Sequence, residues 1–213
     1  MIGAIVLAAG ASSRMGRPKA ALPLGRRGHT VLSMGVSALL AAGVPRVVVV
    51  AGAHPEAVRG ALGARDQRVS VIDHPAWSEG QLSTLLCGLE AIEHPGLEAA
   101  LVTLVDVPLV SPETVRALMR EWRATGAPIV RPAQGDRHGH PVLFDRRLFV
   151  ELRAADLRTG AKPVVHAHAN ELVNLPVADE GAFVDLDVLE DYERVQRMLT
   201  SREQGSGISR PDP

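Results

Sequence analysis

A loop that can bind phosphate groups lies close to the start of the chain. Residues 7–19 read LAAGASSRMGRPK, in which small residues and two glycines are interspersed with three cations, Arg14, Arg17 and Lys19. Small residues let backbone N–H groups approach a phosphate chain closely, and the cations can neutralise it. The spacing is not that of a P-loop, and the pattern G-x-G-x-x-G is absent. The alternative is a surface loop that is basic by chance, but the loop follows an apolar run, at a position where α/β proteins bind ligands.

An aspartate that can hold a metal ion follows another apolar run, in the sequence Val105-Asp106-Val107-Pro108. A carboxylate at the end of a strand can bind Mg²⁺, a hard cation that takes oxygen ligands and few of them from the protein. The same residue type also forms turns and caps helices. From the residues alone, the turn is the commoner use of a lone aspartate, so both interpretations stay open.

Metal sites and nucleophiles based on soft ligands are not indicated. The single cysteine, Cys87, lies in the apolar run LLCGL, which is typical of a buried core residue. His138 and His140 have H-x-H spacing, but no third soft ligand accompanies them. Neither zinc binding nor thiol chemistry is predicted.

Short apolar runs alternate with helical patterns, and these elements must position the loop and the aspartate. Strands are expected at 2–8, 46–51, 69–73 and 99–105. Most of these runs are almost entirely apolar, as is usual for strands buried on both faces of a parallel sheet. Helices are expected at 31–42, 81–92 and 112–125, the last capped by Ser111 and ended by Gly126. The alternation predicts right-handed βαβ units and an open α/β sheet.

The second half of the chain has a looser pattern. Further strands are expected at 129–131, 142–144, 172–176 and 183–185, and a final helix at 189–199. Residues 201–213 are polar and rich in glycine and proline, so they are predicted to be disordered. One domain at 1–200 and a tail at 201–213 are therefore expected.

The composition is that of an ordinary globular protein. Of the 213 residues, 46% are hydrophobic and 22% charged, and the net charge is −1, so neither a nucleic-acid nor a membrane partner is expected. No signal peptide or membrane-spanning run is visible, and a cytoplasmic location is predicted. Among the 23 basic residues only Lys19 and Lys162 are lysines.

The first loop resembles that of the MobA-like NTP transferases, and within them the chain is most similar to the molybdenum cofactor cytidylyltransferases. Four further blocks resemble the family in order and spacing: HPAWSEGQLST at 74–84, VDVP at 105–108, RHGHPVLF at 137–144 and DLDVLEDY at 185–192. The resemblance reaches about residue 199. It implies a single-domain, three-layer α/β/α fold with a mostly parallel sheet, of the nucleotide-diphospho-sugar transferase (Rossmann-like) type.

The resemblance also implies an activity, the transfer of an NMP unit from an NTP to a phosphorylated acceptor with release of pyrophosphate. CTP is the favoured nucleotide, and molybdopterin or molybdenum cofactor is the expected acceptor. The catalytic residues would be Lys19, Arg14 and Asp106, with Mg²⁺ held by Asp106 and by Asp185 on the expected late strand; whether Asp187 joins them is open. The nucleotide would bind to Leu7, Ala8, Ala9, Gly10, Arg14, Lys19, Gly80, Ser83 and Thr84.

The acceptor would bind to Arg137, His138, His140 and Lys162. Lys162 stands where the family often has arginine, and Val188-Leu189 replaces Thr-Pro in the last block. The competing functions are guanylyl transfer to the same acceptor, a sugar-phosphate nucleotidyltransferase and a non-catalytic carrier of a pterin nucleotide. Retention of Lys19 together with two acids argues against the carrier. The implied partners are an NTP, a phosphorylated small molecule, and a molybdoenzyme or its chaperone.

Overall fold

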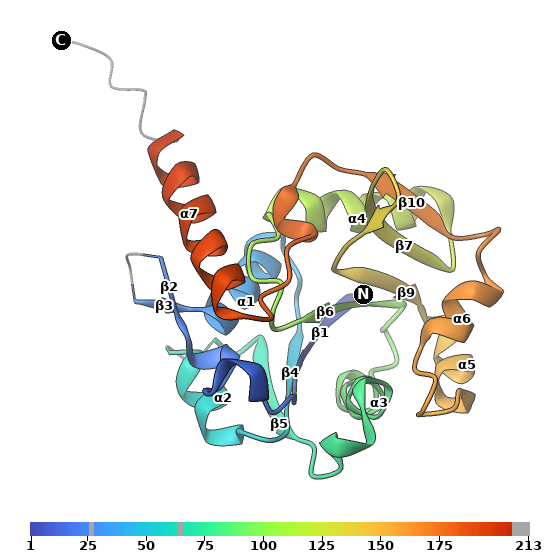
Figure 1. Cartoon of the computed structure of the whole chain (residues 1–213). Coiled ribbons are helices and arrows are strands. Elements are labelled where there is room, and N and C mark those ends of the chain that lie inside the picture. Colours follow the sequence, from blue (N-terminus) through green and yellow to red (C-terminus); the bar gives the residue numbers. More distant parts are fainter. Residues whose placement is uncertain (26–27, 64–65, 206–213) are drawn as a thin grey trace.

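A mostly parallel β-sheet forms the centre of the molecule (Figure 1). The computed structural model describes residues 1–25, 28–63 and 66–205, without the side chains of Arg14 and of residues 201–205. In sheet order the strands are β10 (Val173–Pro176), β7 (Ile129–Gln134), β9 (Val142–Asp145), β6 (Ala99–Leu104), β1 (Ile2–Ala8), β4 (Val47–Ala51) and β5 (Val69–Asp73). β8 (Arg137–His138) pairs with β7, and β2 (Pro23–Leu24) and β3 (His29–Thr30) form a separate hairpin.

The pairing directions decide which strand ends meet. β1 is parallel to β4 and β6, β4 is parallel to β5, and β7 is parallel to β10. β9 runs antiparallel to both of its neighbours, β6 and β7. The carboxyl ends of β1, β4 and β6 therefore lie at one edge of the sheet, which is where open α/β sheets bind ligands.

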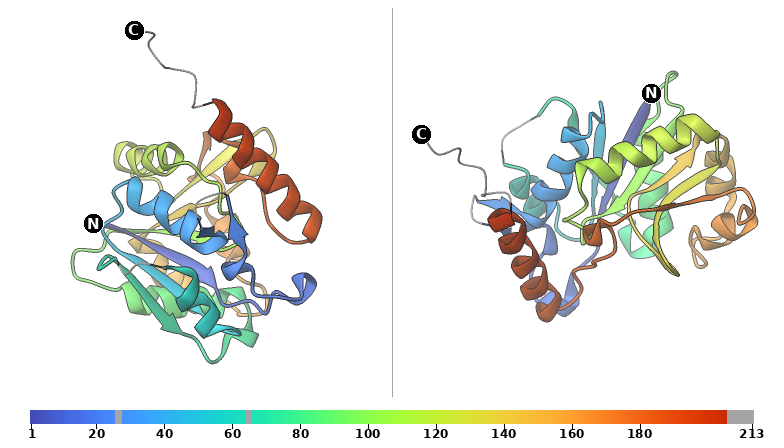
Figure 2. Two further views of the ribbon diagram at one scale, coloured as in Figure 1. Left: turned by 90° about the vertical axis from the view of Figure 1, so that its left-hand side faces the viewer. Right: turned by 90° about the horizontal axis from the view of Figure 1, so that it is seen from above.

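Helices cover both faces of the sheet, which gives three layers (Figure 2). One face carries α1 (Val31–Ala41), α2 (Pro55–Ala61) and α4 (Pro112–Thr125), and the other carries α3 (Gln81–Ile92), α5 (Phe149–Ala154) and α6 (Lys162–Ala167). α7 (Leu189–Gly205) packs Val195 and Leu199 against the β2 region. Short 3₁₀ turns are η1 (Ser13–Met15), η2 (Lys19–Ala21), η3 (Trp77–Glu79), η4 (Arg146–Leu148) and η5 (Glu180–Ala182). No helix in the described ranges has the length and apolar character needed to cross a membrane.

Strand β1 illustrates why the sheet needs both helical layers. All of its residues are buried, with Val6 on the α1 side and Ile5 on the α3 side. Because successive side chains point to opposite faces, an apolar strand is fully buried only when both faces are covered. Gly88 brings α3 close to this strand, since a Cβ at that position would lie 2.4 Å from Ile5 Cγ2.

Most of the predicted elements are confirmed. The strands expected at 2–8 and 69–73 and the helix expected at 81–92 have the predicted bounds. At the start of α4 the Ser111 side chain accepts a hydrogen bond from the Thr114 N–H, and Gly126 ends the helix with φ 61°. The expected capping residues therefore act as predicted.

The C-terminal region differs from the prediction in two places. Residues 183–185 do not form a strand but an irregular segment, held by a 2.9 Å hydrogen bond from the Leu186 N–H to the Asp106 carbonyl oxygen. This bond is not continued by the regular backbone hydrogen bonds that would make residues 183–185 a strand. Helix α7 continues beyond the expected end at residue 199 to Gly205, so the first part of the predicted disordered tail is helical. The prediction for residues 206–213 lies outside the described residues.

His168 follows α6 and ties it to α5. Its Nε2 lies 2.9 Å from Glu151 Oε2 and its Nδ1 lies 3.2 Å from Glu171 Oε1. The hydrogen bond to Glu151, more than any other contact, raises the pKa of His168 above its ordinary value of 6.5. A raised folded-state pKa contributes stability that is fully present below 6.5 and is lost as the pH rises through the folded-state value.

We therefore expect His168→Gln to lower the Tm under mildly acidic conditions and to have a progressively smaller effect above pH 6.5. Thermal melts of both proteins across this pH range measure the difference. Glu151→Gln removes the partner charge and should give the same pH dependence. A Tm difference that does not change with pH would show that the charge on His168 is not the cause.

Candidate active site

A cavity of about 410 Å³ opens at the carboxyl ends of β1 and β6. It is lined by the residues after β1, by the start of α3 and by the end of β6. The candidates found together there are Leu7, Ala8, Ala9, Gly10, Lys19, Gly80, Thr84 and Asp106. Residues from three separate parts of the sequence thus face one space, as the predicted nucleotide site requires.

The loop after β1 positions Lys19 through its backbone. Ser12 has φ 53°, a left-handed conformation that costs a residue with a Cβ roughly 1–2 kcal/mol. Its Oγ accepts a 3.1 Å hydrogen bond from the Lys19 N–H, and Pro18 restricts the backbone just before it. The backbone of Arg14 lies in η1, but its side chain is outside the described part of the structure, so its role stays a prediction.

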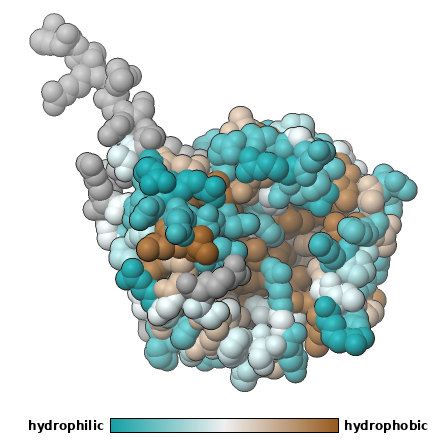
Figure 3. Space-filling model, viewed as in Figure 1, coloured by the Kyte–Doolittle hydropathy of each residue, from teal (hydrophilic) through white to brown (hydrophobic). Residues whose placement is uncertain are grey.

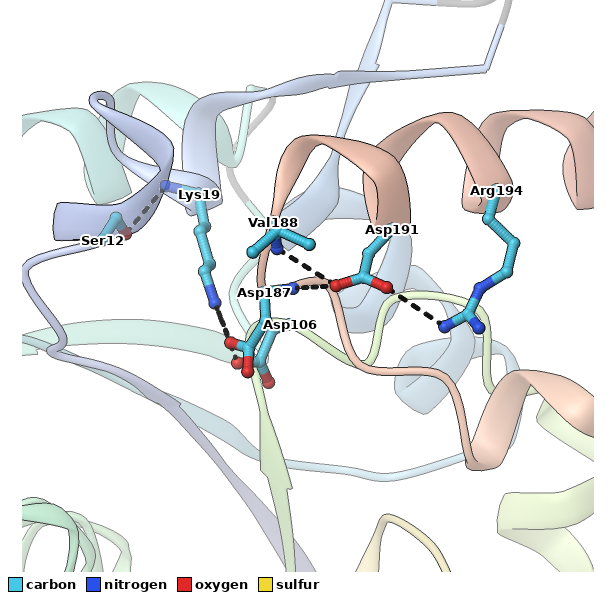
Figure 4. Close-up of polar contacts among 7 residues, drawn as sticks. All are labelled: Ser12, Lys19, Asp106, Asp187, Val188, Asp191 and Arg194. Carbon is cyan, nitrogen blue, oxygen red and sulfur yellow. Dashed lines mark hydrogen bonds and ion pairs between the residues drawn. The ribbon is translucent and has the colours of Figure 1, made fainter.

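The ammonium group of Lys19 lies between two carboxylates (Figure 4). Its Nζ is 2.6 Å from Asp187 Oδ1 and 3.4 Å from Asp106 Oδ2, and the lysine side chain is only 11% exposed. The other oxygen, Asp106 Oδ1, is buried without a hydrogen-bond partner among the described residues. A buried carboxylate oxygen without a donor is costly, and a cation beside it would satisfy it.

Asp187 is held in place by the first turn of α7. Asp191 Oδ2 accepts 3.1 Å hydrogen bonds from the N–H groups of Asp187 and Val188 (Figure 4). Asp191 Oδ1 in turn lies 3.4 Å from a guanidinium nitrogen of Arg194. The position of Asp187 therefore depends on the helix that follows it.

Asp185 lies close enough to Lys19, Asp106 and Asp187 for their charges to act on it. Burial raises the pKa of its carboxyl, and the charge of Asp106 raises it further, against the opposing influence of His140. Within the described residues, no three acids, histidines or cysteines already converge as a metal cluster. Mg²⁺ commonly uses one or two carboxylates together with water and substrate phosphates. Asp106, with its orphaned oxygen, and one of the two late aspartates fit that donor set.

A second cavity, of about 660 Å³, adjoins the first and shares Leu7, Gln81 and Leu104 with it. Residues of β6, β7 and β9 and of helices α3 and α6 line it. In the view of Figure 3 apolar residues gather in a hollow near the middle of the face, with hydrophilic residues around it. The acceptor candidates that line this cavity are His138, His140 and Lys162.

Two of the histidines that line the second cavity, His138 and His140, do not supply positive charge there at neutral pH. Burial lowers the pKa of His140, and burial together with the charge of Arg131 lowers that of His138. Both imidazoles are therefore neutral near pH 7. Arg131 and Lys162 are the arginine and the lysine among the residues that line the cavity.

Three candidates whose side chains the structure describes, Asp185, Ser83 and Arg137, line neither of these cavities. Ser83 points elsewhere, because neighbouring positions on a helix face different directions; its Oγ lies 2.7 Å from His74 Nε2 and 3.3 Å from Glu79 Oε2. Arg137 forms a 3.2 Å ion pair with Glu180 and lies 5.0 Å from the centre of the Phe183 ring. Ser83 and Arg137 are therefore held by contacts with neighbouring side chains and do not line these cavities.

The sequence assigned no definite role to two residues at the site. Whether Asp187 joins the metal site was left open, and its contact with Lys19 arises from an irregular segment that no periodicity describes. Arg131 was seen only as the end of a short strand. The alternation of strand side chains could have indicated it, because Arg131 must share a face with buried Ile129.

The sheet order, the glycine-containing loop and the strand-end aspartate are those of an open α/β protein with a candidate ligand site at its strand ends, and sequence comparison identifies the family. The profile of the MobA-like NTP transferase domain matches residues 4–172. The chain belongs to this family of nucleotidyltransferases. The matched range includes the loop, Asp106 and the residues of the second cavity, but it ends before Asp187.

The names of the curated relatives differ in the reaction that they describe. Nicotine blue oxidoreductase of Paenarthrobacter nicotinovorans is 32% identical over 198 residues, covering 90% of this chain and 94% of the relative. A probable molybdenum cofactor guanylyltransferase of Mycolicibacterium paratuberculosis is 35% identical over 137 residues. That alignment covers 64% of this chain and 66% of the relative, so about one third of the transferase is not matched.

Solved structures share the whole fold. A nucleotidyl transferase of Methanothermobacter thermautotroptrophicus has a TM-score of 0.80 at 26% identity, with 95% of this chain and 99% of that chain covered. Rv0371c of Mycobacterium tuberculosis, in complex with manganese, has a TM-score of 0.74 at 29% identity, with 92% and 98% covered. The expected fold, of the nucleotide-diphospho-sugar transferase type, is confirmed.

Proposed function

We propose that this protein transfers an NMP unit from an NTP to a phosphorylated, pterin-type acceptor and releases pyrophosphate. The observation that carries the proposal is the group at the first cavity: the Lys19 ammonium beside Asp106, whose buried Oδ1 has no partner among the described residues. Nucleotidyl transfer depends mainly on positioning and on charge stabilisation, and a lysine with a metal-binding carboxylate supplies both.

Residues of the first cavity would bind the nucleotide, and residues of the second cavity would bind the acceptor. The backbone after β1 binds the triphosphate, and Lys19 neutralises charge that develops on the leaving pyrophosphate. Asp106 with Asp185 or Asp187 would hold a divalent cation, which supplies further neutralisation of the phosphate oxygens. The acceptor would lie in the second cavity, so that its phosphate meets the α-phosphorus where the cavities join.

CTP is the first candidate nucleotide, because the sequence blocks of this chain most resemble those of cytidylyltransferases. GTP is the second, because a relative that is 35% identical is named a guanylyltransferase. The oxidoreductase name of another relative supports a different reaction class. Hydride or electron transfer has no need for a lysine held between carboxylates, which is why we favour transfer of a nucleotidyl group.

Pyrophosphate release measured with each of the four NTPs, molybdopterin and Mg²⁺ or Mn²⁺ tests this proposal. We expect acceptor-dependent release that is fastest with CTP. Release that is fastest with GTP would favour the second candidate. No release above that of an Asp106→Asn control with any NTP would contradict nucleotidyl transfer. An acceptor-dependent redox change without pyrophosphate would place the chain in the oxidoreductase class.

The late aspartate of the metal site can be identified by double-mutant cycles. If Asp185 and Asp106 hold the same cation, Asp185→Asn should add little to the loss in kcat/KM caused by Asp106→Asn, because groups that act as a unit are not additive. The same cycle with Asp187→Asn tests the other aspartate. Asp136→Asn, in the exposed turn before β8, is the matched control. Fully additive losses for Asp185 would mean that it acts outside the metal site.

A further inference from the structure

Arg131 is fixed in β7 with its charge available to the second cavity. Its Nε donates a 2.8 Å hydrogen bond to Asn174 Oδ1, and Asn174 is its register partner on β10. This bond orients the guanidinium group and leaves its two terminal nitrogens without a hydrogen-bond partner among the described residues. Arg131 lines the second cavity.

The cavity holds this cation without a compensating acid. No aspartate or glutamate is among the described residues that line it, and no carboxylate of the described chain lies within ion-pair distance of Arg131. Burial lowers the pKa of Arg131, but guanidinium remains charged at any pH at which the protein is folded. A partly buried cation that lacks a protein anion is suited to an anion brought by a ligand.

The position of Arg131 separates it from the reacting phosphate. Val130 pairs with Leu143, which pairs with Leu101 on β6, so Arg131 lies two strands away from β6 and near the level of Val102. Asp106 lies beyond the end of that strand. Strand spacing and rise per residue put the two Cα atoms on the order of 15 Å apart. The Arg131 guanidinium is held by Asn174 on β10, on the side of β7 away from β6. One phosphate cannot contact both.

The surface between the two ends is mostly apolar. Leu85 and Val165 come from the helices, and Val102 and Phe144 from the sheet. A flat or elongated apolar group can cover these side chains while polar groups at its ends reach Asp106 and Arg131. A short sugar phosphate would leave Arg131 unused.

We propose that Arg131 determines acceptor specificity by binding an anionic or carbonyl oxygen of the acceptor, at the end remote from the phosphate that receives the nucleotide. This inference rests on the proposed function and adds to it a feature of the acceptor: an elongated, flat body with an oxygen acceptor at the end opposite the phosphate. Asn174 is the positioning residue that orients the guanidinium group.

Two synthetic probes of suitable length test the proposal. One is biphenylyl phosphate, and the other is the same compound with a para carboxylate on the far ring. Their affinities are measured by calorimetry with the full chain and Mg²⁺ but without NTP. We expect the wild type to bind the carboxylated probe about tenfold more tightly, as for one charge-assisted ion pair. Arg131→Met should lose this preference and bind the plain probe unchanged, and Arg131→Lys should keep part of it.

Arg153→Met is the matched control, because Arg153 pairs with Glu93 on the surface and lines neither cavity. It should keep the full preference for the carboxylate. The proposal is overturned if the wild type does not discriminate between the probes, if neither probe binds, or if Arg131→Met weakens both equally. Because the binding test needs no NTP, its outcome is independent of pyrophosphate release, and failure of that assay alone would contradict only the proposed transfer reaction.

Discussion

Asp106→Asn is expected to reduce kcat by about 10³-fold, the upper range for loss of one preorganised electrostatic contact at an active site. Asparagine keeps the shape of aspartate but removes its charge. In the structure Asp106 Oδ2 is 3.4 Å from Lys19 Nζ, and Oδ1 is buried without a partner in the described chain. Removing the charge would weaken cation binding at the place where negative charge collects during transfer.

Steady-state kinetics over a Mg²⁺ titration measure this effect, and a thermal melt of the same variant checks that the fold is retained. Asp136→Asn, on the exposed turn, serves as the matched control and should have near-native kcat. If Asp106→Asn itself has near-native kcat at every Mg²⁺ concentration, Asp106 is not a metal ligand.

Lys19→Arg is expected to reduce kcat/KM by about 10²-fold although it conserves charge, a loss of about 2.7 kcal/mol. An ammonium is a compact point charge that fits among phosphate and carboxylate oxygens, whereas a guanidinium is a wide planar group. The Lys19 side chain is 11% exposed and lies between Asp187 and Asp106, which leaves little room for the larger group. With 21 arginines among 23 basic residues, lysine is not the usual cation of this chain.

The other lysine provides the control. Lys162 lines the second cavity, away from the loop after β1, and it stands where the family often has arginine. Lys162→Arg should therefore stay close to wild type in kcat/KM. A Lys19→Arg enzyme within about threefold of wild type, well below the loss expected for such a contact, would defeat the argument that only an ammonium fits.

The sequence alone predicted those strands and helices whose apolar residues follow a regular pattern. The apolar runs of β1, β4 and β6 and the stripe of α3 predicted the parallel part of the sheet, because burial on both faces leaves a simple signal. Short elements were missed, among them α2, α5, α6 and the β2–β3 hairpin. Two to seven residues carry too few periods of a helix or strand to be distinguished from a loop.

The sequence placed the loop and the aspartate of the candidate site because each directly follows an apolar strand. The loop at 7–19 and Asp106 lie at strand ends, as expected, and they meet because β1 and β6 are neighbours. The late aspartates could not be placed from sequence. The expected strand at 183–185 is an irregular segment, and the Asp187–Lys19 contact depends on how Asp191 caps α7. Alternation along β7 could have placed Arg131 on the face of Ile129, but the sequence does not show that this face and α6 line one cavity.

The central claim is that the α-phosphate of an NTP moves to the acceptor at the Lys19–Asp106 site. Incubation of the protein with molybdopterin and an α-³²P-labelled NTP, followed by separation of the products, tests this most directly. We predict a labelled conjugate of acceptor and nucleotide, formed by the wild type and not by Asp106→Asn, and no conjugate when the label is in the γ-position. Label that stays in free nucleotide with CTP and GTP alike, or a conjugate formed equally by Asp106→Asn, would contradict the account.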